Sequence, residues 1–188
     1  MAARATRLDY ALLALIGQAP RSGYDLRKIF ALTPLAHFSD SPGAVYPSLR
    51  RLERTRWVEP VSTRPEGGRR REAFRLTQAG RRALRDWLRQ PVTRDEVVRD
   101  TDGLLLRFAF MGEWLETREI QAFVEGFVRG LRLHLADLEQ FFSRESARMS
   151  VTGRLAFESG LSGLRAQIAW ARRAGLRLRA AEPERSQS

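Results

Sequence analysis

The chain has 188 residues, 43% of them hydrophobic, which is enough material for one domain or two small ones. It contains no cysteine, which excludes disulfides, thiolate catalysis and cysteine-ligated metal sites. The net charge is +11 and is unevenly divided: residues 1–90 carry 18 basic and 8 acidic side chains (+10), and residues 91–188 carry 15 and 14 (+1). We therefore expect the first half to bind a polyanion.

No segment has the pattern of an export signal or a membrane span. Residues 1–8 are charged and lack the apolar run of a signal peptide. No stretch approaches ~18 uncharged apolar residues, the length that a spanning helix needs. These patterns favour a cytoplasmic protein that does not enter the membrane.

Two short helices are expected within residues 6–32. Thr6 and Asp9 have the spacing of a capping box, and apolar residues at helical intervals follow them. Ser22 and Asp25 repeat the pattern at the start of a second helix. The buried face of the second helix is predicted to consist of Tyr24, Ile29, Phe30 and Leu32.

The stretch from Ser41 to Arg54 is predicted to form a third helix. Ser41 is a favourable N-cap, and Pro42 suits the first helical position because its missing N–H would be unpaired there. One apolar stripe can be buried, and the remaining residues are small, polar or basic. Such a helix can place its N-terminal end in a DNA major groove, with its arginines on phosphate or guanine. The alternative is an ordinary amphipathic surface helix with solvated arginines.

A basic hairpin is predicted after this helix. Residues 57–62 and 72–76 have the composition of short strands, and a turn with Gly67 and Gly68 leads into three arginines. This hairpin can act as a wing that holds phosphate, or its arginines can simply be solvated. A fourth helix, capped by Thr77, completes a DNA-binding domain over residues 6–90. The expected DNA contacts are Ser41, Gly43, Ala44, Tyr46, Pro47, Ser48, Arg50, Arg51, Arg69, Arg70, Arg71 and Tyr24.

The second half is predicted to be a helical dimerisation and effector domain over residues 101–179. A polar connection precedes it at residues 91–100, and a disordered tail follows at residues 180–188. Helices are expected at residues 102–111, 117–143 and 152–178. Two glycines in the second of these, Gly126 and Gly130, are expected to admit another backbone.

Apolar residues in the long helix at 117–143 recur with heptad spacing, and the last helix has a similar apolar face. Burial against a second copy would satisfy both helices, so we expect a homodimer. His134 lies on the heptad stripe, either as a boundary histidine satisfied by a hydrogen bond or as a pH-sensitive or ligand contact. The expected dimerisation residues are Ile120, Val124, Phe127, Leu131, His134, Leu138, Phe157, Leu161, Leu164 and Ile168.

No constellation of catalytic residues occurs in the sequence. Nucleophile-and-base spacing, a phosphate-binding glycine loop and paired carboxylates are all missing, so we expect neither an enzyme nor a cofactor. His37 and His134 have no companion ligands at metal spacing. Tryptophans and phenylalanines of the chain, among them Trp87, Trp114 and Trp170, either pack in the cores or line a pocket for a flat apolar effector.

An ordered series of motifs resembles the PadR family of bacterial transcriptional regulators. The matching stretches are LDYALLAL at residues 8–15, SGYDL at 22–26, SPGAVYPSLRRLE at 41–53, FRLTQAG at 74–80 and LRDWL at 84–88. The resemblance covers nearly all of the first ninety residues and is looser beyond them.

The resemblance implies a mainly α fold, with an N-terminal winged helix-turn-helix and a C-terminal helical dimerisation domain. It also implies a homodimer that represses transcription from an inverted-repeat promoter site, and it allows for release by a small aromatic effector. A winged-helix adaptor that binds an acidic protein partner is the alternative. One departure concerns Arg56, which stands where the family commonly has a glycine at the end of the recognition helix.

Overall fold

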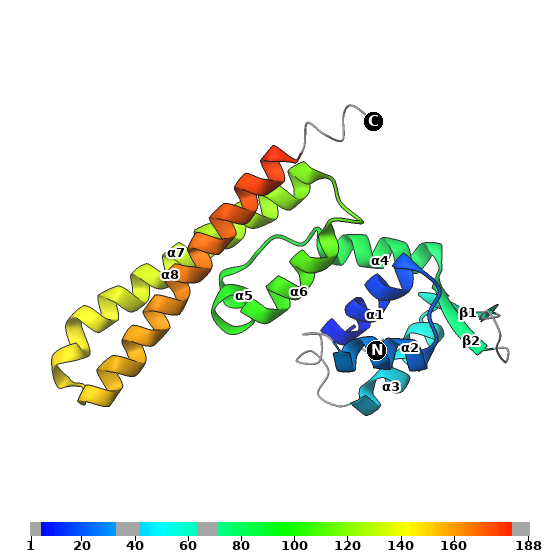
Figure 1. Ribbon diagram of the computed structural model, residues 1–188, viewed down its shortest axis with the longest axis horizontal. Helices are drawn as coiled ribbons and strands as arrows, with labels where there is room; N and C mark the ends of the chain where they lie inside the picture. Colours follow the sequence, from blue (N-terminus) through cyan, green and yellow to red (C-terminus); the bar gives the residue numbers. More distant parts are fainter. Residues whose placement is uncertain (1–4, 33–41, 64–70, 182–188) are drawn as a thin grey trace. The chain divides into compact units, whose positions relative to one another are not determined.

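The computed structural model describes residues 5–32, 42–63 and 71–181 (Figure 1). The chain divides into two compact units, the N-terminal unit Met1–Leu88 and the C-terminal unit Arg89–Ser188. The predicted mainly α fold is confirmed, since helices make up both units and the strands form one two-stranded hairpin within the described residues. None of the described helices is long and apolar enough to cross a membrane.

The N-terminal unit has the order helix, helix, helix, hairpin, helix that the sequence predicts. Its elements are α1 (Arg7–Gln18), α2 (Gly23–Leu32), η2 (Pro42–Ala44), α3 (Val45–Arg54), β1 (Val58–Thr63), β2 (Arg71–Leu76) and α4 (Gln78–Leu88). The strands pair antiparallel from Val58↔Leu76 to Thr63↔Arg71, and Arg21 makes an isolated bridge to Phe74 that joins the α1–α2 turn to β2.

Both predicted capping boxes are present. The Asp9 N–H donates to Thr6 Oγ1 at 3.2 Å, and the Thr6 N–H donates to Asp9 Oδ2 at 2.7 Å. At α2, the Asp25 N–H donates to Ser22 Oγ and the Ser22 N–H donates to Asp25 Oδ2, each at 3.2 Å. These side chains satisfy backbone groups that have no partner within the helix.

The buried face of α2 differs from the predicted one. Gly23, Leu26 and Phe30 point inward, at positions i, i+3 and i+7 of the helix. Tyr24 and Leu32 are instead 54% and 73% exposed, because they lie outside that inward stripe.

The helix that follows residue 41 begins later than predicted. Pro42–Ala44 form a 3₁₀ turn, so α3 starts at Val45 with Ala44 as a cap that makes no side-chain hydrogen bond. Pro47 lies in the first turn of α3, where a backbone N–H has no helical partner in any case. The predicted N-cap, Ser41, lies outside the described residues.

The end of α3 is a left-handed Schellman cap. Arg56 has a φ of 58°, its N–H donates to the Glu53 carbonyl, and the Trp57 N–H donates to the Leu52 carbonyl, both at 2.9 Å. The left-handed end therefore forms with an arginine in place of glycine, at a cost of roughly 1 kcal/mol. Close packing fixes this end, since a Cβ added at Gly80 of α4 would lie 2.0 Å from the Trp57 carbonyl oxygen.

Within the described residues, the C-terminal unit contains one α-helix and one 3₁₀ turn more than the sequence predicts. Its elements are α5 (Arg94–Arg99), α6 (Thr101–Met111), α7 (Thr117–Glu145), η3 (Ser146–Arg148) and α8 (Val151–Ala180). The short helix α5 occupies the expected polar connection and begins with a capping box between Thr93 and Glu96. α7 begins with Glu116 as its cap, paired with Glu119, rather than with Thr117.

α5 and the segment before it pack against α7 at two of its glycines. A Cβ added at Gly130 would lie 2.7 Å from Val97 Cγ2, and one at Gly126 would lie 3.5 Å from Val92 Cβ. The predicted close approach therefore exists within the chain, and the side chains of Val92 and Val97 occupy it.

The heptad stripe of α7 belongs to the core of a single chain. α7 and α8 lie side by side along their lengths (Figure 1). Six of the expected dimerisation residues are buried within the unit, so packing inside one chain accounts for their burial: Ile120, Val124, Phe127 and Leu131 of α7, and Leu161 and Ile168 of α8. Their role in a dimer stays a prediction. His134, Leu138, Phe157 and Leu164 are half-buried.

Aromatic rings of the C-terminal unit pack on one another. Phe108 stacks on Phe123 with centroids 6.2 Å apart and meets Trp170 edge-on at 5.7 Å. The guanidinium of buried Arg107 lies over the Phe123 ring at 5.0 Å, and its Nη1 lies 3.5 Å from Glu96 Oε1. Burial lowers the pKa of Arg107, and the charges of Glu96 and Asp100 oppose that shift. In the structure these rings thus pack on one another, with Phe123 buried, Phe108 half-buried and Trp170 38% exposed.

Candidate nucleic-acid interface

The helix α3 has one buried face and one exposed face. Val45, Ser48, Leu49 and Leu52 are buried. The exposed face of α3, together with the turn before it, consists of Gly43, Tyr46, Pro47, Arg50, Glu53 and Arg54. This face is small and polar at its N-terminal end and charged towards its C-terminal end.

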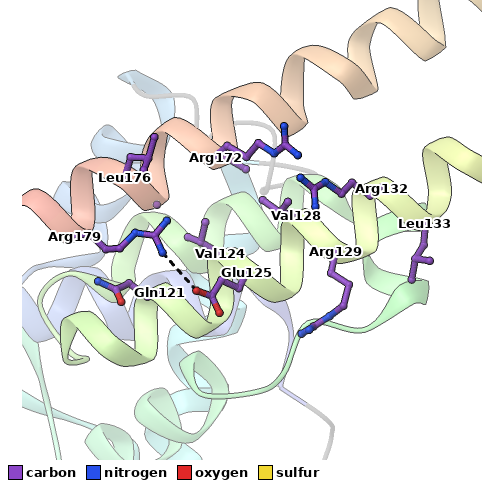
Figure 2. Close-up of a pocket in the computed structure, with 12 residues that line it drawn as sticks. Gln121, Val124, Glu125, Val128, Arg129, Arg132, Leu133, Arg172, Leu176 and Arg179 are labelled. Atoms are coloured by element: carbon purple, nitrogen blue, oxygen red, sulfur yellow. Dashed lines mark ion pairs between the residues drawn. The ribbon is translucent and has the colours of Figure 1, made fainter.

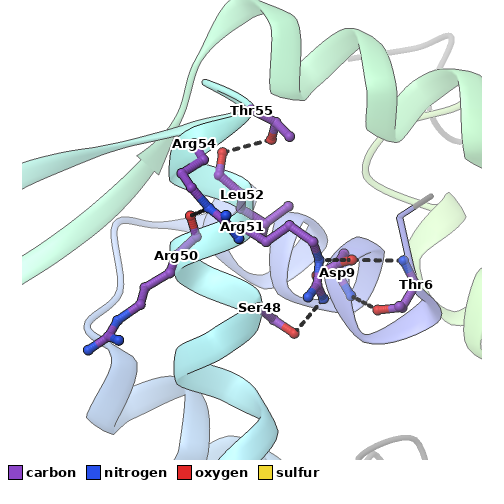
Figure 3. A network of polar contacts seen from close by, with 8 residues as sticks. All are labelled: Thr6, Asp9, Ser48, Arg50, Arg51, Leu52, Arg54 and Thr55. Atoms are coloured by element: carbon purple, nitrogen blue, oxygen red, sulfur yellow. Dashed lines mark hydrogen bonds and ion pairs between the residues drawn. The ribbon is translucent and has the colours of Figure 1, made fainter. Parts of the chain in front are cut away.

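A buried ion pair fixes the orientation of α3 (Figure 3). Arg51 donates from Nη2 to Asp9 Oδ1 at 2.6 Å and from Nε to Asp9 Oδ2 at 3.0 Å. The side chain of Asp9 is 1% exposed and that of Arg51 is 25% exposed. The same Arg51 nitrogen donates to Ser48 Oγ at 3.0 Å, and Asp9 also accepts from the Thr6 N–H. This Asp9–Arg51 network, made of Thr6, Asp9, Ser48 and Arg51, joins α1 to α3.

Two residues predicted to contact DNA, Arg51 and Ser48, belong to this network instead. Arg51 was expected to meet phosphate or guanine, but its guanidinium is held by the Asp9 carboxylate. Ser48 was expected to meet base edges, but it is 3% exposed and its hydroxyl accepts from Arg51. Arg50, one residue earlier, points away from α1 into solvent (Figure 3). Arg51 and Ser48 therefore position α3, and the DNA contact expected of Arg50 stays a prediction.

Other predicted residues come together around a concavity of about 430 Å³ that lies between α2, α3 and β2. Tyr24, Tyr46 and Arg50 all line it. Tyr46 lies close against α2, because a Cβ added at Gly23 would come within 2.7 Å of its Cε1 atom. The structure thus places a tyrosine from each of two helices beside an exposed arginine. Of the two roles predicted for Tyr24, burial and DNA contact, its exposure rules out the first.

Two carboxylates that the sequence did not single out also border this concavity. Glu53 of α3 and Glu72 of β2 line it together with Arg50. Carboxylates repel phosphate but accept hydrogen bonds from the amino group of cytosine in the major groove. Glu53 lies three residues after Arg50 on the exposed face of α3, and this helical spacing is the signal that could have identified it.

The wing is described only in part. Arg69 and Arg70 lie outside the described residues, and Arg71 opens β2 with a side chain that also lies outside them. Arg75 of β2 pairs with Glu59 of β1 at 2.7 Å, and both side chains are about half exposed, at 60% and 46%. The predicted phosphate contacts of the wing arginines therefore stay predictions.

The residues from α1 to α4 match a known family. A sequence model described as the Transcriptional regulator PadR-like family matches residues 12–86, which include α3 and both strands. The match covers most of the N-terminal unit, which is therefore similar to the PadR-like family. The expected winged helix-turn-helix is thereby confirmed, and the matching model describes transcriptional regulators, in agreement with the sequence prediction.

Several solved PadR structures are similar to the chain at low identity. The PadR-like regulator BC1756 from Bacillus cereus is 21% identical, with 95% of this chain and 99% of that one covered and a TM-score of 0.43. Bacillus subtilis PadR in complex with operator DNA is 23% identical, with 91% and 98% covered and a TM-score of 0.40. The same protein in complex with p-coumaric acid is 21% identical, with 92% and 95% covered and a TM-score of 0.41. No curated protein matches the chain significantly.

The Asp9–Arg51 network predicts a large loss of stability when one partner is removed. Arg51→Met should lower the free energy of unfolding of the N-terminal unit by about 3 kcal/mol, because it leaves a buried carboxylate without a counter-charge. The double variant D9N/R51M should recover part of this loss. Urea unfolding followed by circular dichroism measures both.

The matched control is Arg54→Met, on the exposed side of the same helix, which should change stability by less than about 0.5 kcal/mol. Equal effects of the Arg51 and Arg54 substitutions would contradict the structural role of the pair.

Proposed function

We propose that this PadR-like regulator binds promoter DNA through the exposed face of α3 and acts as a homodimeric repressor at an inverted-repeat site. The proposal rests on the different roles of the two faces of α3. Arg51 and Ser48 hold the helix to α1, and Tyr46, Pro47 and Arg50 remain exposed. This role places the protein in the cytoplasm.

In this proposal the N-terminal part of α3 enters the major groove, as recognition helices of this class do. Tyr46 and Tyr24 supply ring faces and hydroxyl groups for contacts with bases and sugars, and Gly43, Ala44 and Pro47 allow close approach. Arg50 binds phosphate. Glu53, at the border of the concavity, discriminates against bases that offer no hydrogen-bond donor.

The wing supplies further affinity that does not depend on sequence. Arg69, Arg70 and Arg71 would bind phosphate beside the groove that α3 enters, with Ser41 as an additional contact before α3. Each phosphate neutralised by an arginine releases condensed counterions, so affinity should fall steeply as the salt concentration rises. The +10 charge of residues 1–90 supports this part of the proposal.

The homodimer in this proposal uses residues other than the buried heptad stripe. Phe141, Val151 and Leu155, around the turn that joins α7 to α8, are 49%, 63% and 60% exposed. Large apolar side chains that lie close together on a surface favour an interface between proteins. Two copies would each bind one half-site, as an inverted repeat requires.

The proposal also includes a small effector that releases the DNA. Aromatic side chains that were predicted to line its site contact one another. Phe108, Phe123 and Trp170 pack on one another. An adaptor that binds an acidic protein through the same exposed face is the competing function. A protein partner that survives nuclease treatment in a pull-down would favour the adaptor.

Substitutions on α3 test the DNA-binding proposal. Arg50→Ala should weaken binding to all sequences and reduce the slope of log K against log salt by about 0.9, the value for one lost phosphate contact. Tyr46→Ala should mainly reduce the preference for the upstream promoter over random DNA, by about 1–3 kcal/mol. Fluorescence anisotropy between about 50 and 200 mM salt measures both quantities.

Arg165→Ala, on exposed α8 of the other unit, is the control and should leave affinity and slope unchanged. An unchanged slope in the Arg50 variant would contradict the phosphate contact. Failure of the wild-type protein to bind its upstream DNA at low salt would refute the function as a whole.

The dimer proposal predicts that Leu155→Asp yields monomers. The side chain is exposed in the single chain, so the variant should keep its unfolding midpoint while sedimentation shows half the mass and operator affinity falls. Thr152→Asp adds the same charge to the same turn without removing an apolar group, and it should remain dimeric. A Leu155→Asp protein that sediments as a dimer would show that the interface lies elsewhere.

A further inference from the structure

A long groove lies between α7 and α8 in the C-terminal unit (Figure 2). Its volume is about 730 Å³, within the range of small-molecule sites. The α7 residues that line it run from Gln121 to Leu133 at helical spacing, and the α8 residues run from Ala171 to Arg179. Twelve residue steps along α7 correspond to about 18 Å, so the groove suits an extended molecule better than a compact one.

The middle of the groove is apolar. Val124 and Val128 of α7 line it opposite Leu176 of α8. A Cβ added at Gly175 would lie 3.3 Å from Val124 Cγ1, so the two helices meet closely there and close the floor. Leu133 and Leu176 are 54% and 61% exposed, which leaves apolar surface along the opening. Covering this surface with a hydrocarbon would remove it from water.

Two arginines face each other across one end of the groove. Arg132 of α7 and Arg172 of α8 point towards one another (Figure 2). Neither forms an ion pair or hydrogen bond with any described side chain, whereas Arg179 at the other end lies 3.7 Å from Glu125 Oε1. Two guanidinium groups without a carboxylate between them repel each other, and an anion placed between them would relieve that repulsion.

The far end of the groove carries a neutral polar group beside the Arg179–Glu125 ion pair. Gln121 lines the groove, and its Nε2 atom is buried without a hydrogen-bond partner among the described residues. An unsatisfied buried amide costs free energy, which a ligand or water at this end would recover. The groove therefore has a cationic end, an apolar middle and a polar end.

We infer that this groove binds a linear amphipathic carboxylate of the fatty-acid type, with its carboxylate between Arg132 and Arg172. Its chain would run over Val128 and Val124 towards Gln121. The inference goes beyond the proposed function, since it requires neither DNA binding nor a dimer.

A second copy of the chain is the competing occupant. In a two-fold interface the same surface meets itself, so a dimer formed across the groove would bring Arg132 and Arg172 against their own copies. Like charges without an intervening carboxylate disfavour that arrangement. The exposed apolar residues proposed for the dimer also lie outside the groove, because Phe141, Val151 and Leu155 do not line it.

Calorimetric titration of the full chain with dodecanoate, below its micellar concentration and without DNA, tests the inference. We expect saturable binding with one molecule per chain, and much weaker binding of dodecanol, which lacks the charge. The double variant R132Q/R172Q should bind dodecanoate about tenfold more weakly or worse, because charge-assisted hydrogen bonds are lost.

The matched control is R144Q/R173Q, which removes one arginine from each of the same helices outside the groove and should bind within about twofold of wild type. Circular dichroism verifies that all variants are folded, and their affinity for promoter DNA without dodecanoate should be unchanged.

Three results would overturn the inference. The first is equal affinity of R132Q/R172Q and wild type for dodecanoate, or no binding by wild type. The second is binding of the wild-type protein to phosphatidylglycerol vesicles but not to free dodecanoate, which would indicate that the groove binds a membrane surface. The third is dissociation of a wild-type dimer by Leu133→Asp or Leu176→Asp, which would assign the groove to a second copy.

Discussion

The buried pair between Asp9 and Arg51 is the interaction on which the proposed DNA-binding surface depends. A carboxylate that is 1% exposed needs a partner, and Arg51 provides two parallel hydrogen bonds across 42 positions of the sequence. Successive residues of a helix point in different directions, so fixing Arg51 against α1 turns Arg50 outward. The direction in which Tyr46, Pro47 and Arg50 point is thus a consequence of a contact on the opposite face of α3.

The sequence predicts the order of elements in the N-terminal unit well, because local signals govern it. Thr6 with Asp9 and Ser22 with Asp25 mark helix starts through contacts of three residues' separation, and the structure contains both. The separate roles of Arg50 and Arg51 could not be predicted, since neighbouring arginines look alike until the position of Asp9 is known. The left-handed conformation of Arg56 could not be predicted either. Hydrogen bonds at the end of α3 hold this arginine in a conformation that glycine favours, and the residue type alone does not reveal them.

In the C-terminal unit, periodicity predicts which residues are buried but does not identify what covers them. The 4-3 spacing of Ile120, Val124, Phe127 and Leu131 shows that one face of α7 is covered, but it does not show by what. The covering elements are α5, α6 and α8 of the same chain. α5 was missed because charged residues dominate it, although Thr93 and Glu96 carry the capping signal. The residues left exposed form two separate surfaces. One is the turn between α7 and α8 with its apolar side chains, and the other is the groove between the same helices with Arg132 and Arg172.

Cleavage of DNA from a single tethered position tests most directly whether the exposed face of α3 meets DNA. The chain has no cysteine, so one introduced cysteine can carry an iron chelate that cuts nearby DNA. From Pro47→Cys on α3, we expect cuts at discrete positions within the promoter site, and from Glu158→Cys on α8 we expect none. Cleavage from position 158 without cleavage from position 47 would show that α3 does not meet the DNA.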